Sequence, residues 1–486
     1  IKIFNISYSF YNIHSMILKF YSLFLFLTSI FYISNYLNIH YFIFLLSNLI
    51  ILFLLRKIND VHYDDLHPLL HKYINMNYLN QTKFIFVIPN YENVPITNYP
   101  KWCLDLKNYC KENKISTIVL DQNKDAIAKD YADLFLSIDT SNISKVIRAI
   151  EQNCQKEVIA GVLVAGVELA VLGASISKHF NTKSIDINTA INATNKIIRA
   201  KKFKEFGVPS PKFEIVDSIH SVSLDYPYVI KEQEGSGSRG VRIIASKEDR
   251  SAAVKGFAGG RYSKYLVEEF VEGHEISIEA FIHKGEFYYY CFAVRDIETI
   301  SNGKVIEHGS ISDPSYDDTN HSEVKKVFEN ACLALGIEAG PVKGDVLYTN
   351  SGPSVLEVAS RSAPLAPLIS ERIYGTDMVS THIKWVLDVD FVFKPLPVEF
   401  SKSKPVSHRI LLHEPGTLKG ISGIDEAKKS KGVLEIIVLK DLKFPMILDY
   451  PDNGNRILYV AATGSDAIRA RKNAENALSK INLIYK

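Results

Sequence analysis

The sequence has few of the residues that build disulfide frameworks, zinc sites or nucleic-acid surfaces. Its five cysteines are odd in number and show no CxxC spacing, which argues against a disulfide framework or a zinc site and favours a reducing cytosol. The net charge is only +2, so the overall charge does not indicate a nucleic-acid partner. Residues 80–190 carry no G-x-G-x-x-G, the 14 histidines of the chain lack metal-ligand spacing, and no Ser-His-Asp or Cys-His arrangement stands out. The residues left as candidates for a functional site are carboxylates and lysines.

Residues 1–60 carry very few charges and differ from the rest of the chain. Met16–Ile33 and Tyr41–Leu55 are apolar enough to be membrane helices, although the second is short for a full span. Arg56 and Lys57 follow directly, and the positive-inside bias then predicts a transmembrane hairpin, anchored in the inner membrane, with the rest of the chain in the cytoplasm.

A mistaken start is the competing interpretation of this segment. The chain begins with Ile, its first Met is Met16, and Met76 stands just before the first good strand. AT-rich DNA upstream of a gene would encode a similar composition. A signal peptide is less favoured, because no small-residue cleavage site follows. Membrane contact through residues 16–55 is therefore one of two open alternatives.

The length of 486 residues predicts two to four domains. Residues 80–190 alternate apolar strands with helices, which indicates a doubly wound α/β domain. The expected strands are Lys83–Pro89, Ser116–Leu120 and Val158–Val164, and the expected helices are Tyr99–Asn113, Lys145–Gln152 and Glu168–His179.

Residues 191–395 change to short antiparallel strands after a helix at Thr194–Phe206, and residues 396–486 form a third, α+β part that closes with a helix at Ser465–Ile481. The expected strands are Tyr228–Glu232, Gly240–Ala245, Tyr265–Phe270, Glu275–His283 and Glu286–Val294, followed by a helix at Ser322–Leu335 and a hairpin at Pro341–Ala359.

This last hairpin places two acids opposite each other. In KGDVLYTNSGPSVLEVAS the turn is centred on Ser351, and Asp345 and Glu357 are equally far from it. In this register their side chains share one face with Cβ atoms ~5 Å apart, where two carboxylates repel unless a cation lies between them. Such hard oxygen ligands suit Mg²⁺. The alternative is that one carboxylate faces solvent or pairs with Lys343.

Two further segments carry weaker signals. In YVIKEQEGSGSRGVRII, Lys231 ends a strand and a glycine- and serine-rich loop at 235–240 follows, whose amides can approach phosphate oxygens; a flexible turn is the alternative. In LVEEFVEGHEISIEAF, Glu268, Glu272 and Glu275 interrupt apolar strands, where they can serve a nucleotide pocket or lie as solvated acids on an edge strand.

The order of these segments resembles the ATP-grasp superfamily, which includes biotin carboxylase, D-alanine–D-alanine ligase and the L-amino-acid ligases. The most specific stretches are ATNKIIRAKKFKEFGVPSP, the Lys231 strand and its loop, VEEFVEGHEISIE and LEVASR. The resemblance covers the chain from about Lys83 to its end. It implies an ATP-grasp fold, of mixed α/β and α+β class, preceded by a Rossmann-like α/β domain, with a lid over the ATP at about 210–275.

The resemblance also implies a role for individual residues. The residues expected to bind ATP are Lys196, Lys231, Ser236, Gly237, Ser238, Gly240, Glu268, the backbone of Val271, and Glu275 as the ribose acid. The expected ligands of Mg²⁺ (or Mn²⁺) are Asp345 and Glu357, and the expected catalytic residues are Lys231 and Arg361, which steadies the acyl phosphate.

Two positions depart from the family pattern. Many relatives have a metal-binding Asn two residues after the second acid, where this chain has Ala359, which implies a changed metal shell. The segment SRSAPLAP at 360–367 stands where relatives usually have glycines.

The expected function is that of an ADP-forming carboxylate–amine ligase, in which ATP activates a carboxylate as an acyl phosphate and an amine, that of an amino acid, attacks it. The alternatives are a carboxylase-like enzyme that uses bicarbonate, and an ATP-binding module without catalysis. The expected partners are small-molecule carboxylates and amines; the oligomeric state is open, with a homodimer suggested by relatives.

Overall fold

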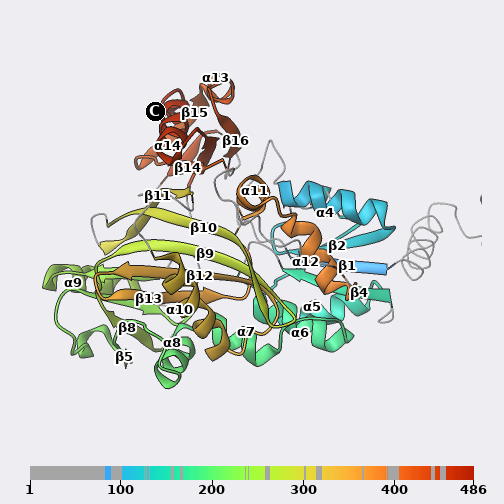
Figure 1. Cartoon of the computed structure of the whole chain (residues 1–486), viewed down its shortest axis with the longest axis horizontal. Helices are drawn as coiled ribbons and strands as arrows, with labels where there is room; N and C mark the ends of the chain where they lie inside the picture. The colour runs from blue at the N-terminus through green and yellow to red at the C-terminus, as the bar shows by residue number, and fades with distance from the viewer. Residues whose placement is uncertain are drawn as a thin grey trace, which may run out of the picture. The chain divides into compact units, whose positions relative to one another are not determined.

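The computed structural model divides the chain into two units, Ile1–Asn77 and Tyr78–Lys486, and all described residues belong to the second (Figure 1). The structure describes residues 83–88, 101–124, 126, 129–130, 132–154, 158–164, 168–235, 237–238, 240–257, 263–299, 303–313, 320–363, 366–389, 391, 404–438, 444–448 and 456–486. Within these residues no helix combines the length and apolar character needed to cross a membrane. The predicted membrane hairpin, residues 16–55, lies outside the described residues.

The first domain is a four-stranded parallel sheet in the order β3-β2-β1-β4, as the alternation of strands and helices predicted. Its elements are β1 (Lys83–Ile88), α4 (Lys101–Glu112), β2 (Ile115–Asp121), β3 (Leu134–Ser137), α5 (Ile143–Glu151), β4 (Ile159–Val164) and α6 (Ala170–Phe180). Strand β3 was not predicted, because four residues at the sheet edge give too short an apolar run.

Both faces of this sheet are buried, which explains its nearly continuous apolar strands. Ile118 and Leu120 pack on one side against α5 and α6. Val119 and Leu163 pack on the other side against α4 and against α12 (Met378–Val386), a helix that lies more than 200 positions further along the chain and sits beside α4 (Figure 1). The chain thus returns to its first domain after β13 (Gly352–Ala359), before the last strands of the central sheet.

Two helices lead from the first domain to the rest of the chain. The predicted helix at Thr194–Phe206 is confirmed as α8 (Lys196–Glu205), and α7 (Ile187–Thr194) precedes it without having been predicted. The helices meet at Asn195, whose side-chain oxygen accepts hydrogen bonds from the amides of Ile197 and Ile198, both at 3.1 Å. This N-cap fixes the start of α8, and with it the position of Lys196.

A small antiparallel sheet follows, in the order β5-β8-β6-β7. Its elements are β5 (Phe213–Val216), the 3₁₀ helix η3 (Ile219–Ser221), β6 (Tyr228–Glu232), β7 (Val241–Ile244), α9 (Lys247–Phe257) and β8 (Tyr265–Glu269). Tyr228, Ile230 and Ile244 form its core with Ala253 and Phe257 of α9. This is the region in which the sequence predicted a lid.

The central sheet has eight strands in the order β13-β12-β9-β10-β11-β14-β18-β16. Its elements are β9 (His274–His283), β10 (Glu286–Thr299), β11 (Val305–Ser312), β12 (Gly340–Thr349), β13 (Gly352–Ala359), β14 (Val406–Leu411), β16 (Val433–Val438) and β18 (Leu458–Thr463). The predicted hairpin turn at Lys284 and Gly285 is confirmed, and both residues have positive φ.

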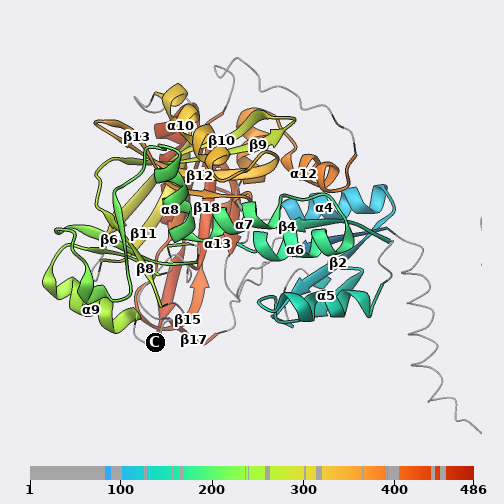
Figure 2. The ribbon, with the colours of Figure 1, turned by 90° about the horizontal axis from the view of Figure 1, so that it is seen from below.

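Alternation along β9 separates the two faces of the central sheet. Ile276, Ile278 and Ala280 pack with Phe203 of α8 and with helix α10 (His321–Ala334), which lies across the strands (Figure 2). Glu275, Ser277 and Glu279 alternate with them, and therefore point to the opposite face. Beyond β13 the chain continues into α11 (Ala366–Ile369), the π-helix η5 (Ser370–Tyr374) and α12.

The last part of the chain adds three strands to the central sheet and a second, three-stranded sheet in the order β17-β15-β19. Its further elements are β15 (Gly416–Ser422), α13 (Ile424–Lys428), β17 (Met446–Leu448), α14 (Ala467–Leu478) and β19 (Asn482–Tyr485). The predicted closing helix is confirmed as α14, which packs its alanines, among them Ala470, against β14 and β18.

The β12–β13 hairpin depends on a close approach at Gly344. A Cβ atom there would lie 2.5 Å from the ring of Phe328 in α10. We expect Gly344→Ala to lower the free energy of unfolding by about 2 kcal/mol, because the overpacked ring must move. Denaturant unfolding measures the change. Gly420→Ala is the control, since its Cβ would meet nothing closer than 3.7 Å; an equal effect of both substitutions would contradict the packing argument.

Candidate active site

The β12–β13 hairpin brings Asp345 and Glu357 opposite each other, as predicted. The position of the turn and the register of the strands differ from the prediction. The turn lies at Asn350 and Ser351, and Val346 pairs with Val355 in a regular ladder. An irregularity that adds Leu356 to one strand then moves Glu357 into register with Asp345. The bulge thus places Glu357 opposite Asp345.

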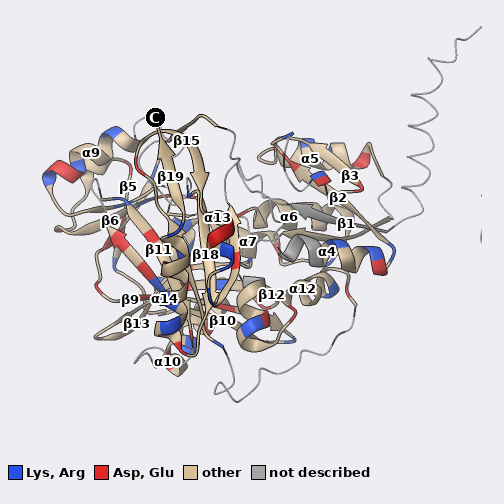
Figure 3. Cartoon of the chain, turned by 90° about the horizontal axis from the view of Figure 1, so that it is seen from above, with Lys and Arg blue, Asp and Glu red and all other residues tan. Residues whose placement is uncertain are grey.

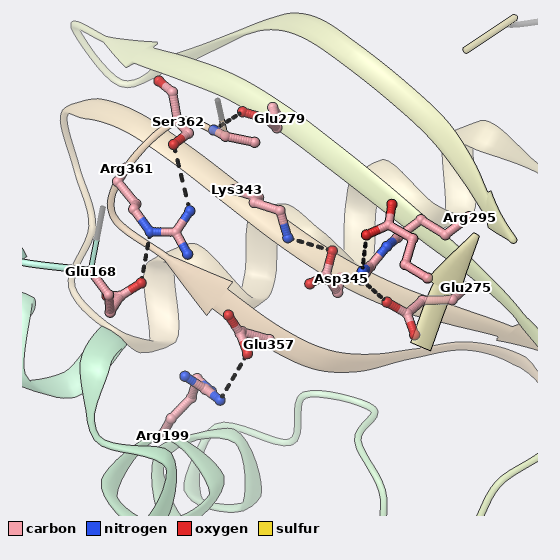
Figure 4. A network of polar contacts seen from close by, with 12 residues as sticks. Glu168, Arg199, Glu275, Glu279, Arg295, Lys343, Asp345, Glu357, Arg361 and Ser362 are labelled. Atoms are coloured by element: carbon pink, nitrogen blue, oxygen red, sulfur yellow. Dashed lines mark hydrogen bonds and ion pairs between the residues drawn. The ribbon is translucent and has the colours of Figure 1, made fainter. Parts of the chain in front are cut away.

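Cations surround this pair of acids (Figure 4). Lys343 Nζ donates to Asp345 Oδ1 at 2.5 Å, and Arg295 Nη1 lies 3.5 Å from Asp345 Oδ2. The alternative partner Lys343 is therefore present together with the facing acid. Arg199 of α8 lies 3.9 Å from Glu357. Burial opposes ionisation of Glu357, but Arg199, Lys343, Lys196 and Arg361 outweigh it and lower its pKa to about 2.

Lys196, the first residue of α8, ties this helix to the glycine- and serine-rich loop. Its Nζ donates to the carbonyl oxygen of Gly235 at 2.8 Å, and its amide donates to that of Gln233 at 2.8 Å. The side chain is buried. Burial lowers the pKa of Lys196 to about 8, while the charge of Glu357 works in the opposite direction. A buried lysine next to a loop of backbone amides is suited to bind an anion.

Lys231 and Glu268 form a buried ion pair on the adjacent strands β6 and β8. Val271, predicted to offer its backbone to adenine, follows two residues after the end of β8. Lys231 is close enough to Lys196 for their like charges to repel, and Lys196 in turn is attracted by the charge of Glu357. The predicted phosphate lysines and one predicted metal acid are thus brought together.

The loop after Lys231 lines a cavity of about 280 Å³. Gly237, Ser238 and Gly240 contribute to this lining and have positive φ, whereas Ser236 lies outside the described residues. Lys304, which was not predicted, lines the same cavity.

The turn between β10 and β11 brings Lys304 to the loop. A Cβ at Gly303, where φ is 67°, would lie 1.9 Å from the carbonyl oxygen of Ile243 in β7, so only glycine permits this approach. The sequence signal would have been Gly303 directly before a lysine, but its docking site, Ile243 of β7, is far away in the chain.

Arg361 lies in a segment that several elements hold. Its Nε donates to Glu168 at 2.7 Å, and Glu168 follows β4 of the first domain. The next residue, Ser362, contacts the hydroxyl of Tyr290 at 3.2 Å. The amide of Ala363 donates to Glu279 at 2.9 Å. The part of the SRSAPLAP segment up to residue 363 is therefore fixed despite its lack of glycine.

Glu168 and Glu279 are acids of this site that the sequence did not indicate. Glu279 is only 2% exposed, and its burial raises its pKa to about 7, although the amide of Ala363, Lys343 and Arg361 favour the ionised form. Glu279 shares a face of β9 with Glu275, but the sequence gives no sign of the loop that it supports.

Glu275, the predicted ribose acid, contacts Arg295 and interacts with Asp345. Its carboxylate is thus on the side of the metal acids, and no contact with Glu268 or Lys231 is found among the described residues. Its role stays a prediction.

The chemistry of Asp345 and Glu357 fits Mg²⁺. Two facing carboxylates supply hard oxygens and leave positions for water and phosphate oxygens, as Mg²⁺ prefers. No third His, Cys, Asp or Glu joins them in a cluster within the described part of the chain. Ala359, opposite Lys343 in the ladder, contributes no oxygen from its side chain.

Two family models match parts of this chain. Residues 193–363 match the family model described as ATP-grasp domain. The chain carries an ATP-grasp domain. Residues 409–486 match a second model, L-amino acid ligase C-terminal domain 2. The two models together span helix α8, the small sheet β5-β8-β6-β7, most of the central sheet and its C-terminal extension.

Individual relatives are distant. The chain is 25% identical to the uncharacterized protein y4rH of Sinorhizobium fredii over 353 residues, 68% of this chain and 70% of that protein. It is 23% identical to the L-arginine-specific L-amino acid ligase of Bacillus subtilis over 292 residues, 57% of this chain and 69% of that protein. The crystal structure of L-amino acid ligase from Bacillus licheniformis shares the fold with a TM-score of 0.68 at 17% identity, covering 83% of this chain and 99% of that one.

The low pKa of Glu357 predicts how the stability of the protein depends on pH. A carboxyl whose pKa is lower in the folded than in the unfolded chain adds stability above pH 4.5 and loses it as the pH falls towards 2. We expect Glu357→Gln to lower the free energy of unfolding by about 2 kcal/mol at pH 7 and by progressively less below pH 4.5. Denaturant unfolding of both proteins at several pH values measures the difference; a difference independent of pH would show that the surrounding cations do not act on Glu357.

Proposed function

We propose that this protein is an ATP- and Mg²⁺-dependent ligase that activates a carboxylate as an acyl phosphate for attack by an amine. The observation that carries the proposal is the pair Asp345 and Glu357, facing each other in a cationic setting inside the ATP-grasp domain. Two acids that are compensated on all sides by Lys and Arg form a site for a cation and for the phosphates that accompany it.

The nucleotide would bind between the lid and the central sheet. Lys196 and Lys231 would contact the phosphates, together with the amides of Gly237, Ser238 and Gly240, and of Ser236 if it follows the family pattern. Glu268 and the backbone of Val271 would receive the adenine, and Glu275 the ribose. Lys304 lines the cavity under the loop and adds a further positive charge there.

Asp345 and Glu357 would hold the magnesium ion. When bound, it offsets the charge of the nucleotide phosphates. The pKa of Glu357, lowered to about 2, keeps this ligand ionised over the whole range in which an enzyme works.

In the first step, an oxygen of the substrate carboxylate attacks the γ-phosphorus and the bond to the bridging oxygen of ADP breaks. Lys196, Lys231 and the loop amides would stabilise the charge of the moving phosphoryl group, because hydrogen bonds and an ion pair hold the two lysines in position. The ion pair with Glu268 fixes the position of Lys231.

In the second step, the amine nitrogen attacks the carbonyl carbon of the acyl phosphate and inorganic phosphate leaves. Arg361 would hold the developing oxyanion, and Glu168 orients its guanidinium through Nε. An amino acid is the proposed amine substrate, because residues 409–486 match the C-terminal domain of L-amino acid ligases.

A phosphate-release screen over pairs of amino acids tests this function. We expect ATP hydrolysis coupled to product formation with at least one pair, dependent on Mg²⁺. Glu357→Ala should reduce kcat by about 100-fold or more, since charge on the phosphates is then no longer offset. Lys202→Ala is the matched control, because this lysine of α8 pairs with Glu205 on the surface and lies outside the site.

Retained turnover in Glu357→Ala would overturn the metal assignment. Release of ADP that requires bicarbonate instead of an amino acid would identify a carboxylase-like enzyme. ATP binding without ADP release over the whole panel would identify a binding module.

A further inference from the structure

A row of charged side chains crosses the central sheet from the candidate metal site to the C-terminal domain. Each member comes from the next strand of the sheet, and acids and bases lie along these strands as well as on surface helices such as α9 (Figure 3). From β13 to β14, the row is Glu357, Asp345, Glu275, Arg295, Glu307 and His408. No family role assigned above requires such a row.

Arg295 is the cation at the centre of the row (Figure 4). It contacts Glu275, lies 2.9 Å from Glu307 and lies 3.5 Å from Asp345, and its side chain is 17% exposed. An arginine keeps its positive charge at any pH of interest. The guanidinium of Arg295 therefore interacts with three carboxylates, and the strength of each ion pair depends on the other two.

The C-terminal domain competes for one of these acids. Arg456, two residues before β18, donates to Glu307 at 2.9 Å, through the same carboxylate oxygen that Arg295 uses. His408 of β14 lies 3.5 Å from the other oxygen of Glu307 and contacts Ser310 at 2.9 Å. Because Arg456 and Arg295 donate to the same oxygen of Glu307, a stronger interaction of one arginine with Glu307 weakens that of the other.

We propose that Arg295 is a counter-ion that competes with the divalent cation for Asp345, and that Arg456 of the C-terminal domain sets the strength of this competition through Glu307. The inference rests on the proposed function, in which Asp345 is a metal ligand. A guanidinium and a divalent ion on one carboxylate repel each other. When the ion takes Asp345, Arg295 keeps Glu275 and Glu307, so its charge stays compensated.

Binding of Mn²⁺ alone to the full chain tests the proposal, with the electron paramagnetic resonance signal of free Mn²⁺ as the readout. We expect Arg295→Met to lower the dissociation constant about tenfold, because the competing charge is gone. Arg456→Met should lower it about threefold, since Glu307 then draws Arg295 away from Asp345. In the Arg295→Met background, Arg456→Met should have no further effect, because its influence passes through Arg295.

Arg471→Met is the matched control. Arg471, like Arg456, belongs to the C-terminal domain and pairs with an acid of the central sheet, Asp296 of β10 at 3.1 Å, but it lies outside the row. Its removal changes the net charge equally and should leave the dissociation constant unchanged. Arg295→Lys, which keeps the charge without the fork of donors, provides an intermediate value if Arg295→Met does not fold.

The outcomes separate the inference from the proposed function. Binding that is unchanged or weaker in Arg295→Met, or in Arg295→Lys where only that variant folds, overturns the role of Arg295. An equal gain in Arg456→Met and Arg471→Met overturns the role of the row, since net charge alone then explains the change. Wild-type protein that binds no Mn²⁺, with or without ADP, removes both the inference and the metal site on which the proposed function depends.

Discussion

Two carboxylates held face to face are the constraint on which this site depends. Asp345 and Glu357 cannot both stay ionised at such close range unless positive charge surrounds them. The fold supplies that charge from separate segments: Arg199 from α8, Lys343 from the same hairpin and Arg295 from β10. The negative charge of the two acids is therefore offset by cations from three separate segments.

Hydrogen bonds and ion pairs near these acids connect the parts of the described chain. The amide of Lys196 donates to the carbonyl oxygen of Gln233, which links α8 to the segment after β6. The amide of Val355 donates to that of Pro209 at 2.8 Å, which links β13 to the segment before β5. Glu168 of the first domain reaches Arg361. Arg456 reaches Glu307 from the C-terminal domain. Each domain thus contributes a charged or polar group to the site, so that the position of each domain affects the chemistry.

Sequence reasoning predicted what local patterns determine. The apolar runs of β1, β2 and β4, the hairpins of the lid and central sheet, and the pairing of Asp345 with Glu357 all follow from alternation and turn position. The pairing was correct although the bulge at Leu356 was not foreseen, because a shift of the turn and an added residue cancel.

Other features depend on partners far along the chain and could not be predicted. Lys304 and Glu168 are single residues whose surroundings give no motif, and only the folded chain places them at the loop and beside Arg361. Arg295 is a similar case, since a lone arginine in a strand carries no sign that three acids from other strands will meet it. Helix α12, which covers the first domain, likewise reveals its partner only in the fold.

A crystal structure of the protein with ADP and Mn²⁺ tests the central claim most directly, because manganese can be located by its anomalous scattering. The account predicts a manganese peak between the carboxylates of Asp345 and Glu357, with Lys196 and Lys231 on the phosphates. A peak elsewhere, or an Asp345 that remains bound to Lys343 and Arg295 with the nucleotide in place, would contradict it.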